Sequence, residues 1–399
     1  MDYVDISAHT LGEPVFQTPE NGVKLESEHK RVFPVSTAID FTCKVQRYRQ
    51  MSQTAPQSAV IWNHLGYYLA RSGQYQEAID AYAQSLRIHA KAPRIWYNYA
   101  TLLEKLGWYC DAVSSYQQAL VISPDYFKAM YGKSKNLYKL GRYQEAVASY
   151  ENSLRSPLAT GVHAAELWYG RGKALMKLNR IDAAIESFER ALSILPQAHK
   201  VWASLGQALT YQNKDAAALK KFDKALKLAP QSALYWTHRG FLLKRMGRYE
   251  EALDAFDEAI FLEPSVARTW HHRGLTLMNM QCYPDAHDSF ERALKHQAYD
   301  YKSGLSLGWA LEKMGDYSQA IEAYNKSLSI EPDQSFAFYR QARCYAILQR
   351  NHLAVEHLRR AIALHPESYI PRSQADPVLR NVEAKALRQS TPVAAMTTV

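Results

Sequence analysis

The sequence is poor in the residues that usually build disulfide frameworks and metal centres. Its four cysteines, Cys43, Cys110, Cys282 and Cys344, lie far apart, and no two of them form a CxxC pair. This spacing indicates neither a disulfide framework nor a zinc site, and it favours reduced thiols in a reducing compartment. We therefore expect no metal ion and no cofactor.

Long apolar runs and targeting signals are also lacking. No stretch approaches the roughly 18 consecutive apolar residues of a membrane helix, so we expect no membrane insertion. The first residues lack the basic start and apolar run of a signal peptide, which makes the cytoplasm the expected location.

Catalytic motifs are missing as well. The chain contains no HExxH, no GxSxG, no Walker GxxxxGK[ST] and no GxGxxG after a strand. The segments outside the repeats described below, residues 1–58 and 369–399, are too short for an added catalytic domain. We expect that the protein is not an enzyme.

Apolar material and positive charge are present in quantity. Hydrophobic residues make up 47% of the chain and charged residues 22%, which is enough for a folded core. The formal net charge of +9 favours acidic partners, nucleic acid or an anionic membrane surface, without choosing between them.

Tryptophan recurs every 34 residues along much of the chain. If each Trp is position 4 of a 34-residue unit, nine units fall into register between residues 59 and 368. Position 20 is then always alanine, position 8 is always small, position 24 is aromatic in eight units, and proline closes six units at position 32. Positions 4, 7, 8 and 11 share one helical face, as do 20, 24, 27 and 28, so each unit predicts two amphipathic helices. Glycine at position 15 of five units predicts the end of the first helix.

This pattern, Trp-x2-Leu-Gly-x2-Leu with Ala at 20, Phe or Tyr at 24, Ala at 27 and Pro at 32, resembles the tetratricopeptide repeat. The resemblance implies an all-α fold, namely a right-handed superhelical solenoid of about nine helix-turn-helix hairpins. The regular spacing and the terminal prolines argue against the related pentatricopeptide RNA readers.

The register divides the chain into four segments. They are an N-terminal segment (1–58), units 1–3 (59–160), units 4–9 (161–368), and a C-terminal capping helix with a loose tail (369–399). In the first segment, residues 35–53 predict a helix with Ala38, Phe41, Val45 and Tyr48 on one face. Four residues inserted near 156–161 form either a flexible joint or, as we favour, a longer turn in a continuous array.

In the family that the chain resembles, ligands usually bind the concave face, which positions 2, 5, 9 and 12 of each first helix line. Of the 27 residues at positions 2, 5 and 9, eight are Lys or Arg and only Glu166 is acidic. Tyrosines at position 5 add flat apolar area with a hydroxyl group. These charges either keep the surface soluble or, as we favour, form a binding groove. Its candidate residues are Arg94, Tyr97, Lys128, Tyr131, Lys135, Tyr169, Lys173, Lys200, Arg268, Lys302, Tyr339 and Arg343.

The function that we favour is a non-catalytic scaffold or adaptor that binds an acidic or extended protein segment in this groove. Binding of single-stranded nucleic acid by the same groove is an alternative, although no Lys/Arg-rich run concentrates the charge. A chaperone-like assembly factor is a third possibility. The carboxylate clamp of co-chaperones is incomplete, because only Asn98 and Lys128 match it.

Two further features of the sequence suggest hypotheses. Residues 1–33 carry six acidic and three basic residues and could occupy the basic groove. His238 and His272 both fall at position 6, and His271 adjoins the second. Because packed helices lie about 8–10 Å apart, a shared metal ion would need favourable rotamers, and we expect ordinary, partly exposed histidines. His287, at a usually apolar position, predicts a hydrogen-bonded side chain.

Overall fold

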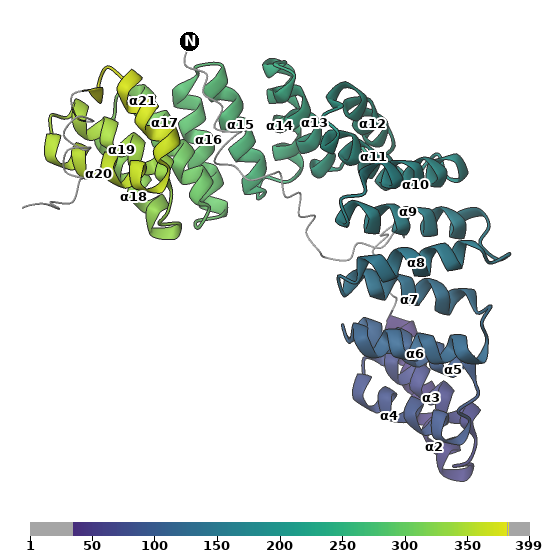
Figure 1. The fold of residues 1–399 in the computed structure, drawn as a ribbon. Coiled ribbons are helices and arrows are strands. Elements are labelled where there is room, and N and C mark those ends of the chain that lie inside the picture. The colour runs from purple at the N-terminus through teal and green to yellow at the C-terminus, as the bar shows by residue number, and fades with distance from the viewer. Residues whose placement is uncertain (1–34, 381, 383–399) are drawn as a thin grey trace, which may run out of the picture. The chain divides into compact units, whose positions relative to one another are not determined.

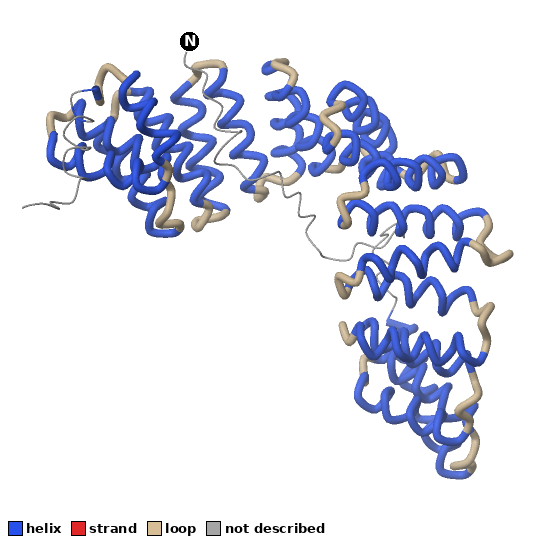
Figure 2. Tube along the Cα trace, viewed as in Figure 1, coloured by secondary structure: helices blue, strands red, loops and turns tan. Residues whose placement is uncertain are grey.

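The computed structural model describes residues 35–380 and residue 382, and these residues form twenty helices and no strand (Figures 1 and 2). They fall into two compact units that divide between Leu228 and Ala229. We call them the N-terminal unit and the C-terminal unit. In each unit, every helix packs against the next helix along the chain. The predicted all-α array of helical hairpins is therefore confirmed.

The N-terminal unit contains a flanking helix and five hairpins. Its helices are α2 (Val35–Thr54), α3 (Ala59–Ser72), α4 (Tyr75–Ile88), α5 (Pro93–Lys105), α6 (Tyr109–Ile122), α7 (Phe127–Lys139), α8 (Tyr143–Leu154), α9 (Gly161–Lys177), α10 (Ile181–Ile194), α11 (His199–Tyr211) and α12 (Asp215–Leu228).

The C-terminal unit contains four hairpins and a final helix. Its helices are α13 (Ala233–Arg245), α14 (Tyr249–Leu262), α15 (Ala267–Asn279), α16 (Tyr283–His296), α17 (Tyr301–Met314), α18 (Tyr317–Ile330), α19 (Ser335–Ile347), α20 (Asn351–Leu364) and α21 (Pro366–Ala375). In both units, the second helix of every repeat begins at position 17 of the predicted register. Among residues 35–380 and 382, no helix combines the length and apolarity that crossing a membrane requires.

Close packing inside each hairpin depends on the small residue at position 8. A Cβ atom added at Gly172 would lie 2.5 Å from the ring of Phe188, and one added at Gly274 would lie 2.6 Å from Phe290. Both rings stand at position 24 and are fully buried. The aromatic ring of the second helix therefore fills the space that a missing side chain leaves on the first helix.

The turn inside every hairpin uses a left-handed residue at position 15. Glycine supplies it in five repeats, with φ between 74° at Gly141 and 87° at Gly73. In the other four repeats Asn179, Asn213, Gln281 and Gln349 adopt φ of 56–64° at the same position. The fold imposes this backbone conformation even where the residue has a Cβ atom and pays a steric penalty.

The four inserted residues are taken up partly as helix. α8 has 12 residues and α9 has 17, whereas the first helices of most other repeats have 13. Residues 155–160 connect α8 to α9, which pack against each other in the N-terminal unit.

The flanking segments cover the ends of the array. On α2, Val45 is buried and packs in one core cluster with Leu65 and Leu69 of α3. After α21, Leu379 and Val382 are buried with the last repeat. The predicted tail near 390–399 and the acidic residues 1–33 lie outside the described residues.

Candidate binding face

Positions 2, 5, 9 and 12 of the first helices form the surface that we call the A-face. In the N-terminal unit its polar centre is Glu104, at position 12 of α5. Its carboxylate lies 2.6 Å from Nζ of Lys135 and 3.5 Å from Nζ of Lys139. It also accepts hydrogen bonds from Asn136 (3.0 Å) and from the Tyr116 hydroxyl (3.3 Å). The Glu104 carboxylate thus contacts four side chains, one from its own repeat and three from the next.

The charge state of Glu104 follows from this environment. Burial raises the pKa of the Glu104 carboxyl. The charge and hydrogen bond of Lys135, together with Asn136 and Lys139, lower it by more than burial raises it, so the pKa lies below its ordinary value. The carboxylate is ionised at neutral pH. Lys135, a predicted ligand-binding residue, therefore has an internal counter-ion.

Lys173 of α9 lies near two tyrosine rings, one on α7 of the preceding repeat and one on its own helix. Its Nζ is 4.8 Å from the ring centroid of Tyr138 and 5.8 Å from that of Tyr169. Such contacts hold an ammonium group by attraction to the ring faces. Burial, more than any neighbouring charge, raises the pKa of Tyr131 and Tyr169, so both hydroxyls stay protonated and can donate hydrogen bonds.

Four further candidates lie on the first helices of the same unit. Arg94 and Lys128 are exposed at position 2 of α5 and α7, and Lys200 is half-buried on α11. The ring of Tyr97 lies 5.3 Å from that of Tyr126 and 5.9 Å from that of Tyr116. The structure thus brings cations and aromatic rings together on α5, α7 and α9.

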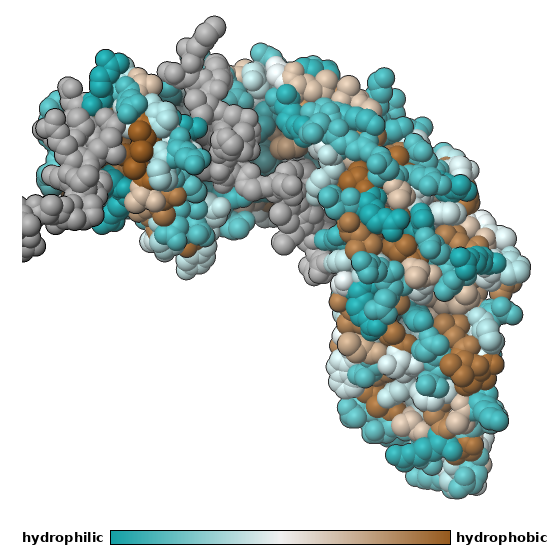
Figure 3. Space-filling model, viewed as in Figure 1, coloured by the Kyte–Doolittle hydropathy of each residue, from teal (hydrophilic) through white to brown (hydrophobic). Residues whose placement is uncertain are grey.

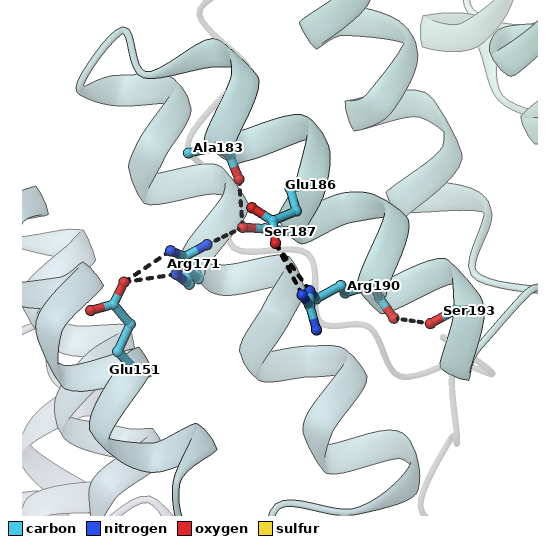
Figure 4. Close-up of polar contacts among 7 residues, drawn as sticks. All are labelled: Glu151, Arg171, Ala183, Glu186, Ser187, Arg190 and Ser193. Carbon is cyan, nitrogen blue, oxygen red and sulfur yellow. Dashed lines mark hydrogen bonds and ion pairs between the residues drawn. The ribbon is translucent and has the colours of Figure 1, made fainter.

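A second polar network stabilises the same repeats away from the A-face (Figure 4). Arg171, at position 7 of α9, donates to Glu151 of α8 at 3.0 Å and to the Ser187 hydroxyl of α10 at 2.6 Å (Figure 4). In the C-terminal unit, Arg273 repeats this geometry with Asp257 at 2.7 Å and Ser289 at 2.9 Å. Arginine at position 7 therefore joins three helices where the repeat pattern has leucine.

In the C-terminal unit, two candidate cations lie beside buried histidines. Arg268 Nε donates to Nε2 of His272 at 3.3 Å, and Nδ1 of His271 lies 2.9 Å from the Ser303 hydroxyl. Burial, assisted by Arg268, lowers the pKa of His238 to about 3. Burial also lowers the pKa of His271 to about 4, although the carboxylate of Asp300 acts in the opposite direction. These imidazoles are therefore neutral at pH 7, although Lys302 and Arg268 lie nearby.

The expectation that these histidines are only partly exposed needs one correction. His271 is 8% exposed, because its ring packs 5.7 Å from Phe290 inside the repeat. In the described part of the chain, the three potential metal ligands that lie within 4.8 Å of one another are His287, Asp288 and Glu291, on α16. His287 Nδ1 is 3.2 Å from the Asp288 carboxylate, as the predicted hydrogen-bonded side chain would be.

The last two candidates contact the chain's own C-terminal segment. The Tyr339 hydroxyl donates to Asp376 at 3.1 Å, and Nη1 of Arg343 lies 3.4 Å from the same carboxylate. The Tyr339 ring also packs 5.2 Å from Tyr369 of α21. Residues that follow the last repeat thus occupy this part of the A-face.

Glu312 is the counterpart of Glu104 in the C-terminal unit, also at position 12. Its carboxylate lies 2.9 Å from Nε of Arg340 and 3.5 Å from Nε of Arg343, and it accepts from the Tyr324 hydroxyl at 3.3 Å. Sequence reasoning missed both carboxylates, because the charges were counted at positions 2, 5 and 9. Reading position 12 in the same way would have found them.

The helical pairs and their recurring positions define a tetratricopeptide-repeat protein, the class that the sequence pattern resembles. A family model described as "Cilia and flagella-associated protein 70 C-terminal domain" matches residues 140–376, and one described as "Tetratricopeptide repeat" matches residues 57–122. The first match spans more than half of the chain. The chain therefore belongs to the tetratricopeptide-repeat family of the cilia and flagella-associated protein 70 C-terminal domain.

Solved structures of tetratricopeptide-repeat proteins are similar to the chain. One, YrrB, is described as a TPR protein with an unusual peptide-binding site; it is 22% identical, with a TM-score of 0.41, and the match covers 48% of this chain and 97% of YrrB. A tetratricopeptide-repeat protein from Parabacteroides merdae is 14% identical, with a TM-score of 0.49 and coverage of 64% and 98%. A chain of the APC/C hetero-tetramer Cut9–Hcn1 is 13% identical, with a TM-score of 0.46 and coverage of 88% and 94%. Comparison with curated proteins gives no match.

Proposed function

We propose that this chain is a non-catalytic, cytoplasmic scaffold that binds an acidic, extended segment of a partner protein on the A-face of the N-terminal unit. The tetratricopeptide fold is consistent with protein–protein interaction, and repeats of this family typically act as non-catalytic scaffolds. The acidic character of the partner and the place of binding are our inference from the side chains of α5, α7 and α9.

The observation that carries the proposal is the position of Lys173 beside Tyr138 and Tyr169. Arg94 of α5 and Lys128 of α7 add exposed cations on the two preceding first helices. Tyrosine rings offer apolar area at little cost in side-chain entropy, and their protonated hydroxyls can donate to carboxylates. Cations around the rings attract an acidic segment and set its association rate. Lys135 contributes less, because Glu104 already neutralises it.

The remaining candidate residues fall into two groups, those that would extend the basic surface and those that already contact the chain's own C-terminal segment. Lys200, Arg268 and Lys302 would extend the basic surface for a longer segment, whereas Tyr339 and Arg343 are already engaged by Asp376. Exposed apolar side chains such as Val60, Val121 and Val162 stand on three different helices, α3, α6 and α9. On the face that Figure 3 shows, hydrophobic residues are interspersed with hydrophilic ones.

Affinity capture with purified full-length chain tests the proposal, with and without nuclease. A variant with Lys128→Glu and Lys173→Glu reverses charge on the A-face, and Lys220→Glu with Lys224→Glu, exposed on α12, is the matched control. We expect nuclease-resistant protein partners that the A-face variant loses and the control retains. Partners that disappear with nuclease would instead identify nucleic acid as the ligand, and equal capture by all three proteins would refute the proposal.

A further inference from the structure

Position 4 of the repeat holds a tryptophan whose ring has two recurring partners. In five repeats its indole N–H donates to the carbonyl six residues earlier, over 2.8–2.9 Å; the pairs are Trp62–Pro56, Trp96–Ala90, Trp202–Pro196, Trp236–Pro230 and Trp270–Pro264. This carbonyl belongs to position 32 of the preceding repeat or to the segment that replaces it. The indole thus bridges the joint between consecutive hairpins.

A cation from the second helix often covers the same ring. The guanidinium of Arg190 lies 5.1 Å from the Trp168 ring, and that of Arg292 lies 4.8 Å from the Trp270 ring. In the last repeat, Arg360 lies 5.6 Å from Phe338, which replaces Trp at position 4. In all three cases the cation stands 22 residues after the aromatic residue.

The eighth repeat lacks this aromatic side chain, because position 4 is Gly304. A pocket of about 710 Å³ opens at this place between α16, α17 and α18. Its lining combines apolar side chains such as Leu294, Leu307 and Ile330 with charged ones such as Arg292, Asp300 and Lys326, around Gly304 itself. The volume lies within the range of about 300–1,000 Å³ that is typical of ligand sites.

The pocket keeps the partners that an indole meets in the other repeats. Ala298 stands six residues before Gly304, at the position of the acceptor carbonyl in five other repeats. Lys326 stands 22 residues after Gly304, at the position of the cation that covers Trp168, Trp270 and Phe338 in their repeats. Both line the pocket. Lys326 also pairs with Glu322 at 2.9 Å, but both side chains are largely exposed, so the ammonium group can turn towards the pocket at little cost.

We propose that this pocket receives the indole of a tryptophan side chain that a partner protein supplies. The partner's indole would take the place of the missing side chain at position 4, with its N–H donating to the Ala298 carbonyl and its ring covered by Lys326. The apolar side chains of the lining, such as Leu294, Leu307 and Ile330, would pack against the ring, and the hydrogen bond favours tryptophan over phenylalanine. This site is separate from the A-face, so the proposed function does not depend on it.

The surface beside the pocket supports an incoming polypeptide. Tyr299 lies between two lining residues, Ala298 and Asp300, and it is 83% exposed. Exposed aromatic rings of this kind are frequent contact residues in protein interfaces. A partner that places a tryptophan in the pocket would also contact this ring.

The chain itself supplies the design of a variant with a filled pocket. Trp202, Trp236 and Trp270 each face alanine at position 27, whereas position 27 of the eighth repeat is Ser327. A Cβ atom at position 304 would meet the Ser327 hydroxyl, so we combine Gly304→Trp with Ser327→Ala. The double variant reproduces a pair of residues that five other repeats already contain, and we expect it to fold.

The test uses N-acetyl-5-fluorotryptophanamide as the probe, followed by fluorine NMR with full-length protein. We expect saturable broadening of the probe signal with the wild-type chain and none with the double variant, whose helical content and melting curve serve as the folding control. The 1-methyl form of the probe cannot donate to Ala298 and should bind about fivefold more weakly. The control variant is Lys313→Ala, on the same helix; Lys313 is exposed, and its replacement should leave binding unchanged. Gly308→Ala is unsuitable as a control, because its Cβ would lie 2.6 Å from the Tyr324 ring.

Three results would overturn the proposal. They are no probe binding by the wild type, equal binding by the double variant, and equal binding of the methylated probe. The chain also has an exposed tryptophan of its own, Trp108, which is 49% exposed. If sedimentation shows self-association that both Trp108→Ala and the double variant abolish, the occupant is a second copy of the chain and not a separate partner.

Discussion

Replacing Glu312 by Gln should destabilise the C-terminal unit far more than the matching change at Glu104 destabilises the N-terminal unit. Both residues stand at position 12 and accept a hydrogen bond from the tyrosine at position 24 of their own repeat. They differ in burial. The Glu312 side chain is 5% exposed and its partner Arg340 12%, whereas Glu104 is 16% exposed and Lys135 44%. The same chemistry is thus present in two different dielectric environments.

The expected magnitudes follow from this difference. Breaking a buried ion pair by removing one partner costs about 3–5 kcal/mol, because the remaining charge stays buried. Arg340 would lose the carboxylate that lies 2.9 Å from its Nε, while its guanidinium stays packed against Trp309 and Phe336. Lys135 can turn into water, so Glu104→Gln should cost about 1 kcal/mol, as for an exposed pair with one weakened hydrogen bond.

Hydrogen exchange measured by mass spectrometry, during urea titration, reports each region separately, which a single global melt of a repeat protein does not. We expect faster exchange in α17–α19 of Glu312→Gln than in α5–α7 of Glu104→Gln. Glu322→Gln, which removes an exposed pair with Lys326, is the control and should change stability by less than about 0.5 kcal/mol. Adding Arg340→Gln to Glu312→Gln should restore part of the loss. Equal effects at Glu312 and Glu104 would refute the reasoning from burial.

Three other outcomes are expected. The pKa of buried His271 is lowered to about 4 from its ordinary 6.5, so between these pH values the unfolded chain binds more protons than the folded chain. The stability of the C-terminal unit should therefore fall as the pH drops from 6.5 towards 4. The urea midpoint of the His271→Gln variant should depend less on pH than that of the wild type. Gln281→Gly should stabilise the chain by about 0.5–1 kcal/mol in chemical denaturation, because φ is 64° there, and the reverse change Gly247→Gln should lose a similar amount. Arg171→Ala should speed hydrogen exchange in α8–α10 and cost about 2 kcal/mol, whereas Arg171→Leu, the usual residue type at position 7, should cost less; equal losses would argue against a packing role for the arginine stem.

The parts of the fold that sequence predicts are local and periodic. The register of both helices, the small residue opposite the aromatic ring and the left-handed residue at position 15 each depend on contacts within one 34-residue unit. At position 15, Asn213 and Gln281 adopt the left-handed backbone conformation although they are not glycine. The packing of the two helices in the hairpin overrides the conformational preference of this one residue. The division at Leu228/Ala229 had no comparable signal, since the pattern continues through it.

The side chains of the A-face were harder to predict, because their charges are settled between repeats. Lys135 is neutralised by a carboxylate 31 residues earlier, and Arg343 by one 33 residues later. Counting the charges on one helical face does not show which of them are paired with a residue of another repeat. The pocket at Gly304 is different, because a missing tryptophan at position 4 was visible in the sequence and only its consequence needed the structure.

The contacts of position 7 restrict how such an array could be shortened or rearranged. Arg171 requires the acid at position 25 of the repeat before it, and so does Arg273, whereas Gln341 is matched with the amide of Asn325 at 2.7 Å and Lys133 with Gln117 at 2.6 Å. Deleting the three repeats between Glu151 and Arg273 would bring an acid and an arginine together at the new joint. If the repeat that contains Asn325 were placed directly before a repeat with arginine at position 7, the guanidinium would face an uncharged amide. At these four joints the neighbouring repeats are matched by pairs of polar residues, so repeats of the same fold are not freely interchangeable.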